Sequence, residues 1–243
     1  FRQYDIRGVV NEDLDEDFAK RLGLAFGTYA LKKGENKVVV GCDNRTSSPT
    51  FKKAVIEGLL STGCDVVDIG TVVTPIFYFA RVHYDINPGI MVTASHNPAQ
   101  FNGFKVAFGP GTIYGDEIQH LRKMMEKGDF NSGKGNVISK DPSEDYINMI
   151  LSKINISKKL RVGIDCGNGT ASLFAEKLFS RLGVDVYPIY CTSDPAFPNH
   201  FPDPVKPENL TDLRELVLKE KLDLGIGFDG DGDRIGVVDD KGN

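Results

Sequence analysis

Residues 222–234 have the sequence LDLGIGFDGDGDR, a largely apolar run that ends in three aspartates separated by single glycines. The apolar run predicts a buried β-strand, and the glycines let the turn after it fold tightly enough for Asp229, Asp231 and Asp233 to converge. Two carboxylates about 4 Å apart repel by roughly 4 kcal/mol at an effective dielectric of about 20, which is more than a marginally stable turn can absorb. The stretch therefore predicts a bound cation.

All-oxygen ligation by a few side chains, with room for water and substrate oxygens, is typical of Mg²⁺, whose usual partner is phosphate. Three alternatives share part of the pattern. An EF-hand calcium loop would have Asp229, Asp231, Asp233 and Asp240 at its positions 1, 3, 5 and 12. Arg234, however, stands where that loop needs glycine, and the preceding segment is strand-like. A haloacid-dehalogenase-type site, with the first aspartate phosphorylated, and a solvated turn without a ligand are the other two.

Strand-like and helix-like segments alternate over almost the whole chain. Strands are predicted at 37–42, 65–69, 89–93, 104–108, 160–165, 184–189 and 222–228, and helices at 14–32, 48–61, 116–126, 170–182 and 209–220. Two more helices are expected, one at Thr74-Pro75, where a cap precedes a proline, and one after Asp141-Pro142-Ser143. Residues 235–243 predict a strand that enters a hairpin turn. Such alternation is typical of an α/β fold.

A polar, glycine-rich segment at 131–136 indicates a domain boundary near residue 140, so we expect one domain over 1–140 and a second over 141–243. The pattern then restarts, because residues 38–44 resemble residues 162–168 at an offset of about 120. Five prolines in 194–207 predict an irregular loop. Since the last residues lie inside a predicted hairpin turn, we expect a fragment of a longer protein.

Composition narrows the class of protein. The 243 residues are 40% hydrophobic and 26% charged, which is typical of a globular chain of one large or two ordinary domains. No run approaches the ~20 apolar residues that span a bilayer, and the first residues lack signal-peptide character, so we expect a cytoplasmic protein with no membrane partner. A net charge of −5 argues against nucleic acid as a partner. Single, scattered cysteines (Cys42, Cys64, Cys166 and Cys191) predict buried, reduced thiols.

Ser95 is the second candidate site residue. Residues 93–98 have the sequence TASHNP, so this serine ends a predicted strand and Asn97-Pro98 turns the chain after it. A hydrolase triad explains it poorly, because adjacent residues such as Ser95 and His96 do not normally face one another and no G-x-S-x-G elbow is present. A phosphorylated Ser95 would supply oxygens to the metal that the three aspartates bind.

Four motifs, in this order, resemble those of the α-D-phosphohexomutases. They are Tyr4-Asp5-Ile6-Arg7-Gly8, TASHNP at 93–98, Asn102-Gly103-Phe104-Lys105 and DGDGDR at 229–234. The resemblance covers the whole chain. It is closest to the bacterial phosphomannomutase/phosphoglucomutase type, through FPNH, PDP and KPENL within 197–210.

The resemblance implies four domains around a cleft, of which this chain holds the first two as similar three-layer α/β domains with mixed sheets. It implies an intramolecular phosphotransferase that interconverts hexose 1-phosphate and hexose 6-phosphate, with mannose and/or glucose as the sugar, through a phosphoserine and a bisphosphorylated intermediate. In this family the third domain reads the sugar hydroxyls and the fourth grips the non-reacting phosphate. The fragment alone is therefore expected to have low activity and to need the missing C-terminal domains of its own chain.

The resemblance also assigns roles to single residues. Ser95 is implied as the phosphoryl carrier, and together with Asp229, Asp231 and Asp233 as a ligand of Mg²⁺. Glucose 1,6-bisphosphate, or mannose 1,6-bisphosphate, is implied as the activator.

Five further residues would surround the substrate. Lys105 is implied as the general acid/base, and Arg7 and Arg234 offer planar donor forks that match phosphate oxygens. Tyr4 and His96 would donate or accept hydrogen bonds near the transferring phosphate. The rival hypotheses are a haloacid-dehalogenase-type phosphotransferase with an aspartate nucleophile, a phosphoglucosamine mutase, and a sugar-phosphate-binding module without turnover.

Overall fold

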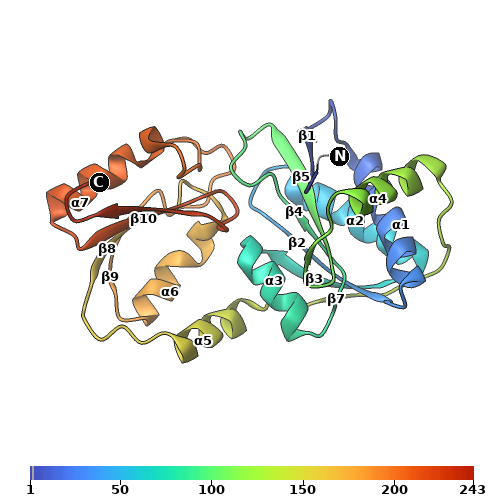
Figure 1. Ribbon diagram of the computed structural model, residues 1–243, viewed down its shortest axis with the longest axis horizontal. Helices are drawn as coiled ribbons and strands as arrows, with labels where there is room; N and C mark the ends of the chain where they lie inside the picture. Colours follow the sequence, from blue (N-terminus) through green and yellow to red (C-terminus); the bar gives the residue numbers. More distant parts are fainter. Residues whose placement is uncertain (2) are drawn as a thin grey trace. The chain divides into compact units, whose positions relative to one another are not determined.

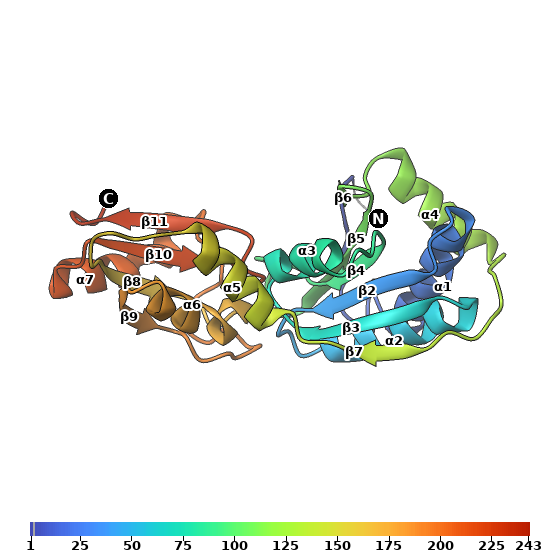
Figure 2. The same cartoon turned by 90° about the horizontal axis from the view of Figure 1, so that it is seen from below.

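Figures 1 and 2 show the computed structural model, which describes residue 1 and residues 3–243. The chain forms two compact units. The first contains Phe1–Thr71, Phe77–Ala94 and Gln100–Asp141, and the second contains Val72–Ile76, Ser95–Ala99 and Pro142–Asn243. Two short segments from the first half of the chain, 72–76 and 95–99, thus pack with the second half.

The first unit is built on a seven-stranded mixed sheet. Its strands lie in the order β1-β5-β4-β2-β3-β7, and β6 pairs with β5. They are β1 (Ile6–Val9), β2 (Lys37–Cys42), β3 (Asp65–Thr71), β4 (Gly89–Val92), β5 (Phe101–Phe108), β6 (Gly111–Thr112) and β7 (Val137–Ser139). Strands β2, β3, β4 and β7 pair in parallel, whereas β5 is antiparallel to its neighbours.

Helices cover both faces of this sheet (Figure 2). They are α1 (Glu16–Lys32), α2 (Ser48–Thr62), α3 (Thr74–His83) and α4 (Asp116–Lys127). Val38 and Val40 of β2 share one buried core with α1, α2 and α4. Because successive residues of a strand point to opposite faces, Val39 faces the other way. Its register partner Gly89 lies against the ring of Phe77 in α3, so α3 covers that second face.

The pairing of α1 with α2 depends on two glycines. A Cβ on Gly23 would lie 2.3 Å from the carbonyl oxygen of Val55, and a Cβ on Gly58 would lie 2.2 Å from that of Lys20. Only glycine allows two helix backbones to approach this closely. Helix α1 begins at Glu16, two residues after the predicted start, because the carboxylate of Asp15 caps it by accepting a hydrogen bond from the N–H of Phe18.

The second unit has a four-stranded mixed sheet in the order β11-β10-β8-β9. Its elements are α5 (Ser143–Lys153), β8 (Arg161–Asp165), η1 (Thr170–Leu173), α6 (Ala175–Arg181), β9 (Asp185–Ile189), η2 (Pro207–Leu210), α7 (Thr211–Glu220), β10 (Leu224–Phe228) and β11 (Ile235–Asp239). Gly163 and Gly225 have no side chains, so Leu213 of α7 packs closely against one face of this sheet. On the other face, the ring of Phe179 in α6 contacts the ring of Phe228 in β10. The predicted α/β fold with mixed sheets is confirmed.

The structure differs from the prediction at one helix and at three short strands. The helix predicted over 170–182 is divided at Phe174, whose backbone (φ −134°) lies outside the helical region, into the 3₁₀ segment η1 and helix α6. Strands β1, β6 and β7 were not predicted, since each has only two to four residues and no alternating pattern of its own.

None of the helices in the described part of the chain is long and apolar enough to cross a membrane.

Candidate functional site

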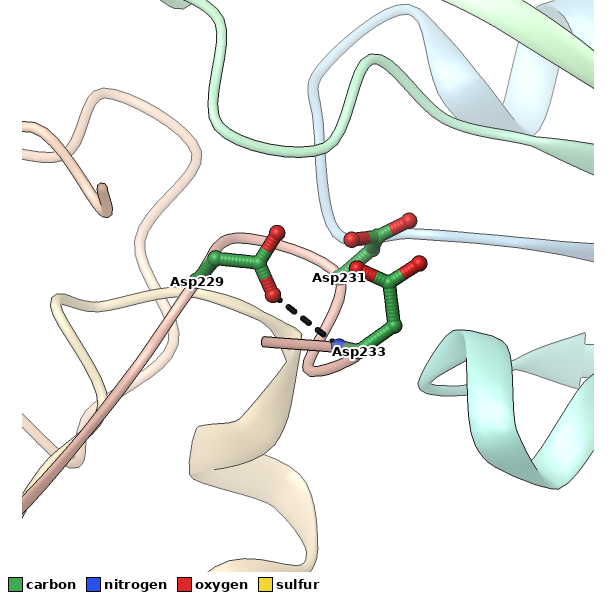
Figure 3. Close-up of side chains that lie close together, drawn as sticks. All are labelled: Asp229, Asp231 and Asp233. Carbon is green, nitrogen blue, oxygen red and sulfur yellow. Dashed lines mark hydrogen bonds between the residues drawn. The ribbon is translucent and has the colours of Figure 1, made fainter. Parts of the chain in front are cut away.

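The acidic loop consists of residues 229–234 and joins β10 to β11 of the second unit (Figure 3). Oδ1 of Asp229 accepts hydrogen bonds from the N–H groups of Asp233, at 2.9 Å, and Arg234, at 3.0 Å. The N–H of Asp229 donates to the carbonyl of Arg234. Gly232 has φ +70°, a conformation that other residues adopt only with strain. The loop is therefore held by its own first aspartate, before any ligand binds.

Three carboxylates meet in this loop. Asp229, Asp231 and Asp233 each place one oxygen so that the three atoms lie within 4.8 Å of one another. Asp229 and Asp231 are fully buried, whereas Asp233 is exposed. Burial, followed by the charges of Asp231 and Asp233, raises the pKa of Asp229 to about 8. Without a cation, this loop thus retains a proton at neutral pH.

The donor set fits Mg²⁺. Mg²⁺ is a hard cation that takes oxygen ligands and is usually held by a few carboxylates together with water and phosphate oxygens. Asp229, Asp231 and Asp233 offer three carboxylate oxygens that converge on one place, and these residues would hold the ion. A divalent cation would also remove the repulsion that raises the pKa of Asp229.

Two of the alternatives for this loop are wrong. An EF-hand loop is flanked by helices, but strands β10 and β11 flank this one and pair antiparallel with Phe228 opposite Ile235. Asp240 lies beyond the end of β11 and outside the loop. A solvated turn is excluded because Asp229 and Asp231 are 0% exposed.

Ser95 lies against the acidic loop, in the segment 95–99 of the same unit. Its Oγ donates a hydrogen bond of 2.7 Å to Oδ2 of Asp229. The serine is 1% exposed, and its backbone has φ +53°, the left-handed region in which residues other than glycine are uncommon. Strain of this kind persists only where the surrounding structure imposes it, and it gathers at functional sites.

His96 faces Ser95, contrary to the expectation that these neighbours point apart. Ser95 Oγ and His96 Nδ1 are 3.2 Å apart, because the left-handed backbone of Ser95 turns both side chains to one side. The guanidinium of Arg234 lies 2.9 Å from the same Nδ1. Since a guanidinium can only donate, Nδ1 accepts, and Nε2 carries the proton of the neutral ring. Arg234 and His96 thus border the serine as a linked pair.

Two residues of this site were not predicted as such. Thr74 Oγ1 donates to Oδ2 of Asp231 at 2.7 Å, and its N–H donates to the Asp231 carbonyl at 2.8 Å. Gly230 lies under Ser95, so that a Cβ on it would be 2.4 Å from the serine carbonyl oxygen. The sequence marked Thr74 only as a helix cap and Gly230 only as a turn residue. Both roles arise from contacts more than a hundred positions away.

Tyr4, Arg7 and Lys105 belong to the first unit and are described within it. Arg7 on β1 is opposite Gly103 on β5, and Lys105 is two residues further along β5. Because side chains two apart on a strand share a face, Arg7 and Lys105 project from the same face of the sheet as diagonal neighbours. Arg7 contacts Oδ2 of Asp5 at 2.7 Å, and Tyr4 is 63% exposed.

Comparison with known families identifies both halves of the chain. Residues 1–132 match the model of phosphoglucomutase/phosphomannomutase, alpha/beta/alpha domain I, and residues 144–242 match that of domain II. The chain belongs to the phosphoglucomutase/phosphomannomutase family. The resemblance drawn from the four motifs is thereby confirmed.

Individual members of this family are similar over the whole chain. A phosphomannomutase/phosphoglucomutase of Pseudomonas aeruginosa is 46% identical over 242 residues, which are 100% of this chain and 52% of that protein. A probable phosphoglucosamine mutase of Pyrococcus horikoshii is 43% identical over 98% of this chain and 52% of its own length. A crystal structure of a phosphoglucomutase/phosphomannomutase family protein from Burkholderia thailandensis has a TM-score of 0.96 and 40% identity, and covers 100% of this chain and 55% of its own. The chain spans about half the length of these relatives.

Proposed function

We propose that Ser95 and the acidic loop form the phosphoryl-transfer site of a phosphohexomutase, which interconverts hexose 1-phosphate and hexose 6-phosphate. The observation that carries this proposal is the 2.7 Å hydrogen bond from Ser95 Oγ to Asp229, one of three clustered carboxylates. A serine hydroxyl held beside three clustered carboxylates that could bind a cation supports phosphoryl transfer through that serine, since this chemistry depends on positioning and on neutralising charge. The family of the chain supports the same reaction class.

The reaction would run through Ser95 in two transfers. Phosphorylated Ser95 passes its phosphoryl group to the free hydroxyl of a hexose monophosphate, and the serine regains a proton. The resulting hexose 1,6-bisphosphate reorients, and its other phosphoryl group moves to Ser95. The net result is an isomerised sugar phosphate and a rephosphorylated enzyme.

Asp229, Asp231, Asp233 and an oxygen of the phosphoserine would hold Mg²⁺. When bound, the ion neutralises charge on the transferring group. The chain's own contribution is position: two backbone N–H groups fix Asp229, and Thr74 fixes Asp231. Arg234, placed beside His96, would donate to the phosphoserine oxygens with its planar fork.

Three residues of the first unit would serve the sugar phosphate. Lys105 is proposed as the general acid/base that moves the proton of the sugar hydroxyl, and Arg7 as a donor to phosphate oxygens. Tyr4 is proposed as a hydrogen-bonding residue at the substrate. The shared face of Arg7 and Lys105 supports a joint role for these two.

The proposed sugar is mannose, glucose or both, and the proposed activator is the matching 1,6-bisphosphate. The Pseudomonas relative is named for both activities, but a relative named for phosphoglucosamine is almost as similar. Coupled assays on the complete protein with mannose, glucose and glucosamine 1-phosphates separate these substrates. We expect turnover of the first two and its loss in Ser95→Ala. Equal turnover of Ser95→Ala and wild type would refute the serine mechanism.

The haloacid-dehalogenase-type alternative makes Asp229 the nucleophile. Both oxygens of Asp229 are already engaged, Oδ1 by two backbone N–H groups and Oδ2 by Ser95, which lowers its nucleophilicity. The two adducts also differ in chemistry, since an acyl phosphate is cleaved by hydroxylamine and a serine phosphate is not. A phosphorylated chain that keeps its phosphate in hydroxylamine supports Ser95, and one that loses it supports Asp229.

A further inference from the structure

Cys166 and Cys191 form a thiol pair in the second unit. Cys166 follows β8 directly and is fully buried, whereas Cys191 is two residues beyond β9 and is partly exposed. Their Sγ atoms are 3.3 Å apart. Strands β8 and β9 bring them together, because Asp165 and Ile189 are register partners at the ends of these strands. The two cysteines are 25 positions apart in the sequence, so no local pattern predicts this contact.

We propose that Cys166 and Cys191 are a redox modification site, at which a hydroperoxide converts the two thiols into a reversible disulfide. A disulfide bond is about 2.05 Å long, so the sulfurs need to approach by only about 1.3 Å. Cys42 and Cys64 belong to the first unit. The thiol of Cys42 is hydrogen-bonded to the hydroxyl of Thr71, and the thiol of Cys64 donates to the carbonyl of Gly27. In the described part of the chain, sulfur therefore meets sulfur only at the pair 166/191.

The partial exposure of Cys191 decides the order of the two steps. Its thiol attacks one oxygen of the hydroperoxide and becomes a sulfenic acid, while the other oxygen leaves as water or an alcohol. The sulfur of Cys166 then attacks the sulfur of Cys191, and the hydroxyl leaves as water with the proton of Cys166. Two thiols are thus oxidised by two electrons, and one peroxide bond is reduced.

The electrostatics of Cys166 suit the second role. The hydrogen bond from Cys191 and burial raise the pKa of the Cys166 thiol well above its usual range. A buried thiol that keeps its proton reacts slowly with a peroxide in solution. It reacts quickly only with an electrophilic sulfur that is already in contact, as in the sulfenic acid of Cys191.

The turn after Cys166 connects the pair to the acidic loop. The carbonyl of Cys166 accepts the N–H of Gly169 at 2.7 Å, and the N–H of Thr170 donates to the carbonyl of Gly230 at 2.9 Å. A Cβ on Gly169 would lie 3.0 Å from the Cα of Gly230, so the two backbones are in direct contact. Movement of Cys166 toward Cys191 would be passed to Gly230. The expectation that oxidation weakens Mg²⁺ binding rests on the proposed function of the acidic loop. The expectation that the disulfide forms does not depend on that function.

Peptide mapping of the 243-residue chain tests the disulfide itself. The chain is treated with hydrogen peroxide, quenched, alkylated without reduction and cut with trypsin. Lys177 and Arg181 lie between the two cysteines, so trypsin places them on separate peptides. We expect a cross-linked peptide pair, lighter than the sum of its parts by two hydrogens, that dithiothreitol separates. Cys191→Ser should lose this cross-link, and Cys64→Ser, a buried thiol of the other unit, should keep it.

Three results would overturn the proposal. One is addition of two or three oxygens to Cys191 while Cys166 remains open to alkylation after unfolding. Another is a cross-link between two chains instead of within one, and the third is four alkylated thiols after treatment. The wild-type map needs no variant to fold. Calorimetry with Mg²⁺ on the oxidised and reduced chain then tests the connection to Gly230 separately, with several-fold weaker binding expected after oxidation.

Discussion

Gly230 and Ser95 touch through their backbones: a Cβ at position 230 would lie 2.4 Å from the carbonyl oxygen of Ser95. Real Cβ atoms do not approach this closely, so the acidic loop and the serine loop fit together only with glycine here. The same two loops exchange the hydrogen bond from Ser95 to Asp229. The serine and the acids therefore form one structural unit.

We predict that Gly230→Ala separates the two loops. The new methyl group meets backbone on one side and Pro202 on the other, so the loops must shift, at a cost of about 1–3 kcal/mol in the free energy of unfolding. Mg²⁺ binding should weaken as well. Gly111→Ala is the control, since a Cβ there meets nothing within 4 Å. Equal melting temperatures for these two variants would contradict the close contact.

We predict that Thr74 contributes to stability and to Mg²⁺ binding by holding the carboxylate of Asp231 in place. Thr74→Val keeps the size of the side chain but removes the hydroxyl that donates to Oδ2 of Asp231, and the loss of this buried hydrogen bond should cost about 1–3 kcal/mol in the free energy of unfolding. We expect a lower melting temperature and weaker Mg²⁺ binding by calorimetry. Thr74→Ser retains the donor and should stay near wild type. Wild-type Mg²⁺ affinity in Thr74→Val would show that the hydrogen bond does not position the ligand.

The pKa of Asp229 predicts an unusual pH dependence of stability. The folded chain without metal binds this proton up to a pH of about 8, whereas the unfolded chain releases it near its ordinary value of 3.8. Stability must therefore fall as the pH rises between these two values, by about 2 kcal/mol between pH 6 and pH 8. Asp229→Asn should flatten the dependence. Denaturant unfolding in EDTA that shows constant or rising stability would contradict the assignment.

Mg²⁺ should reverse that trend, because metal and proton compete for the same oxygens. At a concentration 100 times its dissociation constant, a ligand stabilises the folded state by about 2.7 kcal/mol. We expect a larger increase in melting temperature from Mg²⁺ at pH 8 than at pH 6. An increase that is independent of pH, or that persists in Asp231→Asn, would place the ion elsewhere.

Local patterns in the sequence sufficed for most of the fold. The run Lys37–Cys42 is a strand with the predicted bounds, because a short run of β-branched valines between polar segments favours a buried strand. The helix over 170–182 was predicted as continuous because its apolar pattern is continuous, but the backbone of Phe174 leaves the helical region and divides it, which the pattern does not report. Strand β7 has three exposed residues and is defined only by its pairing with β3, which no local pattern reports.

Part of the candidate site could also be predicted from local sequence, and part could not. Three aspartates in one turn predict a shared ligand because their spacing alone brings them together, and their oxygens do converge. The sequence could not reveal Thr74, the reason for Gly230, or the approach of Cys166 to Cys191, because each depends on how distant segments pack. The facing of Ser95 and His96 was missed for another reason: it needs a left-handed backbone that few serines adopt.

Phosphate mapping after incubation with glucose 1,6-bisphosphate tests the central claim most directly. We predict one phosphate per chain, located on Ser95 by peptide mass, formed in Mg²⁺ and nearly absent in EDTA or in Asp231→Asn. A phosphate on Asp229, or on Ser95 at the same rate without any divalent metal, would contradict the account.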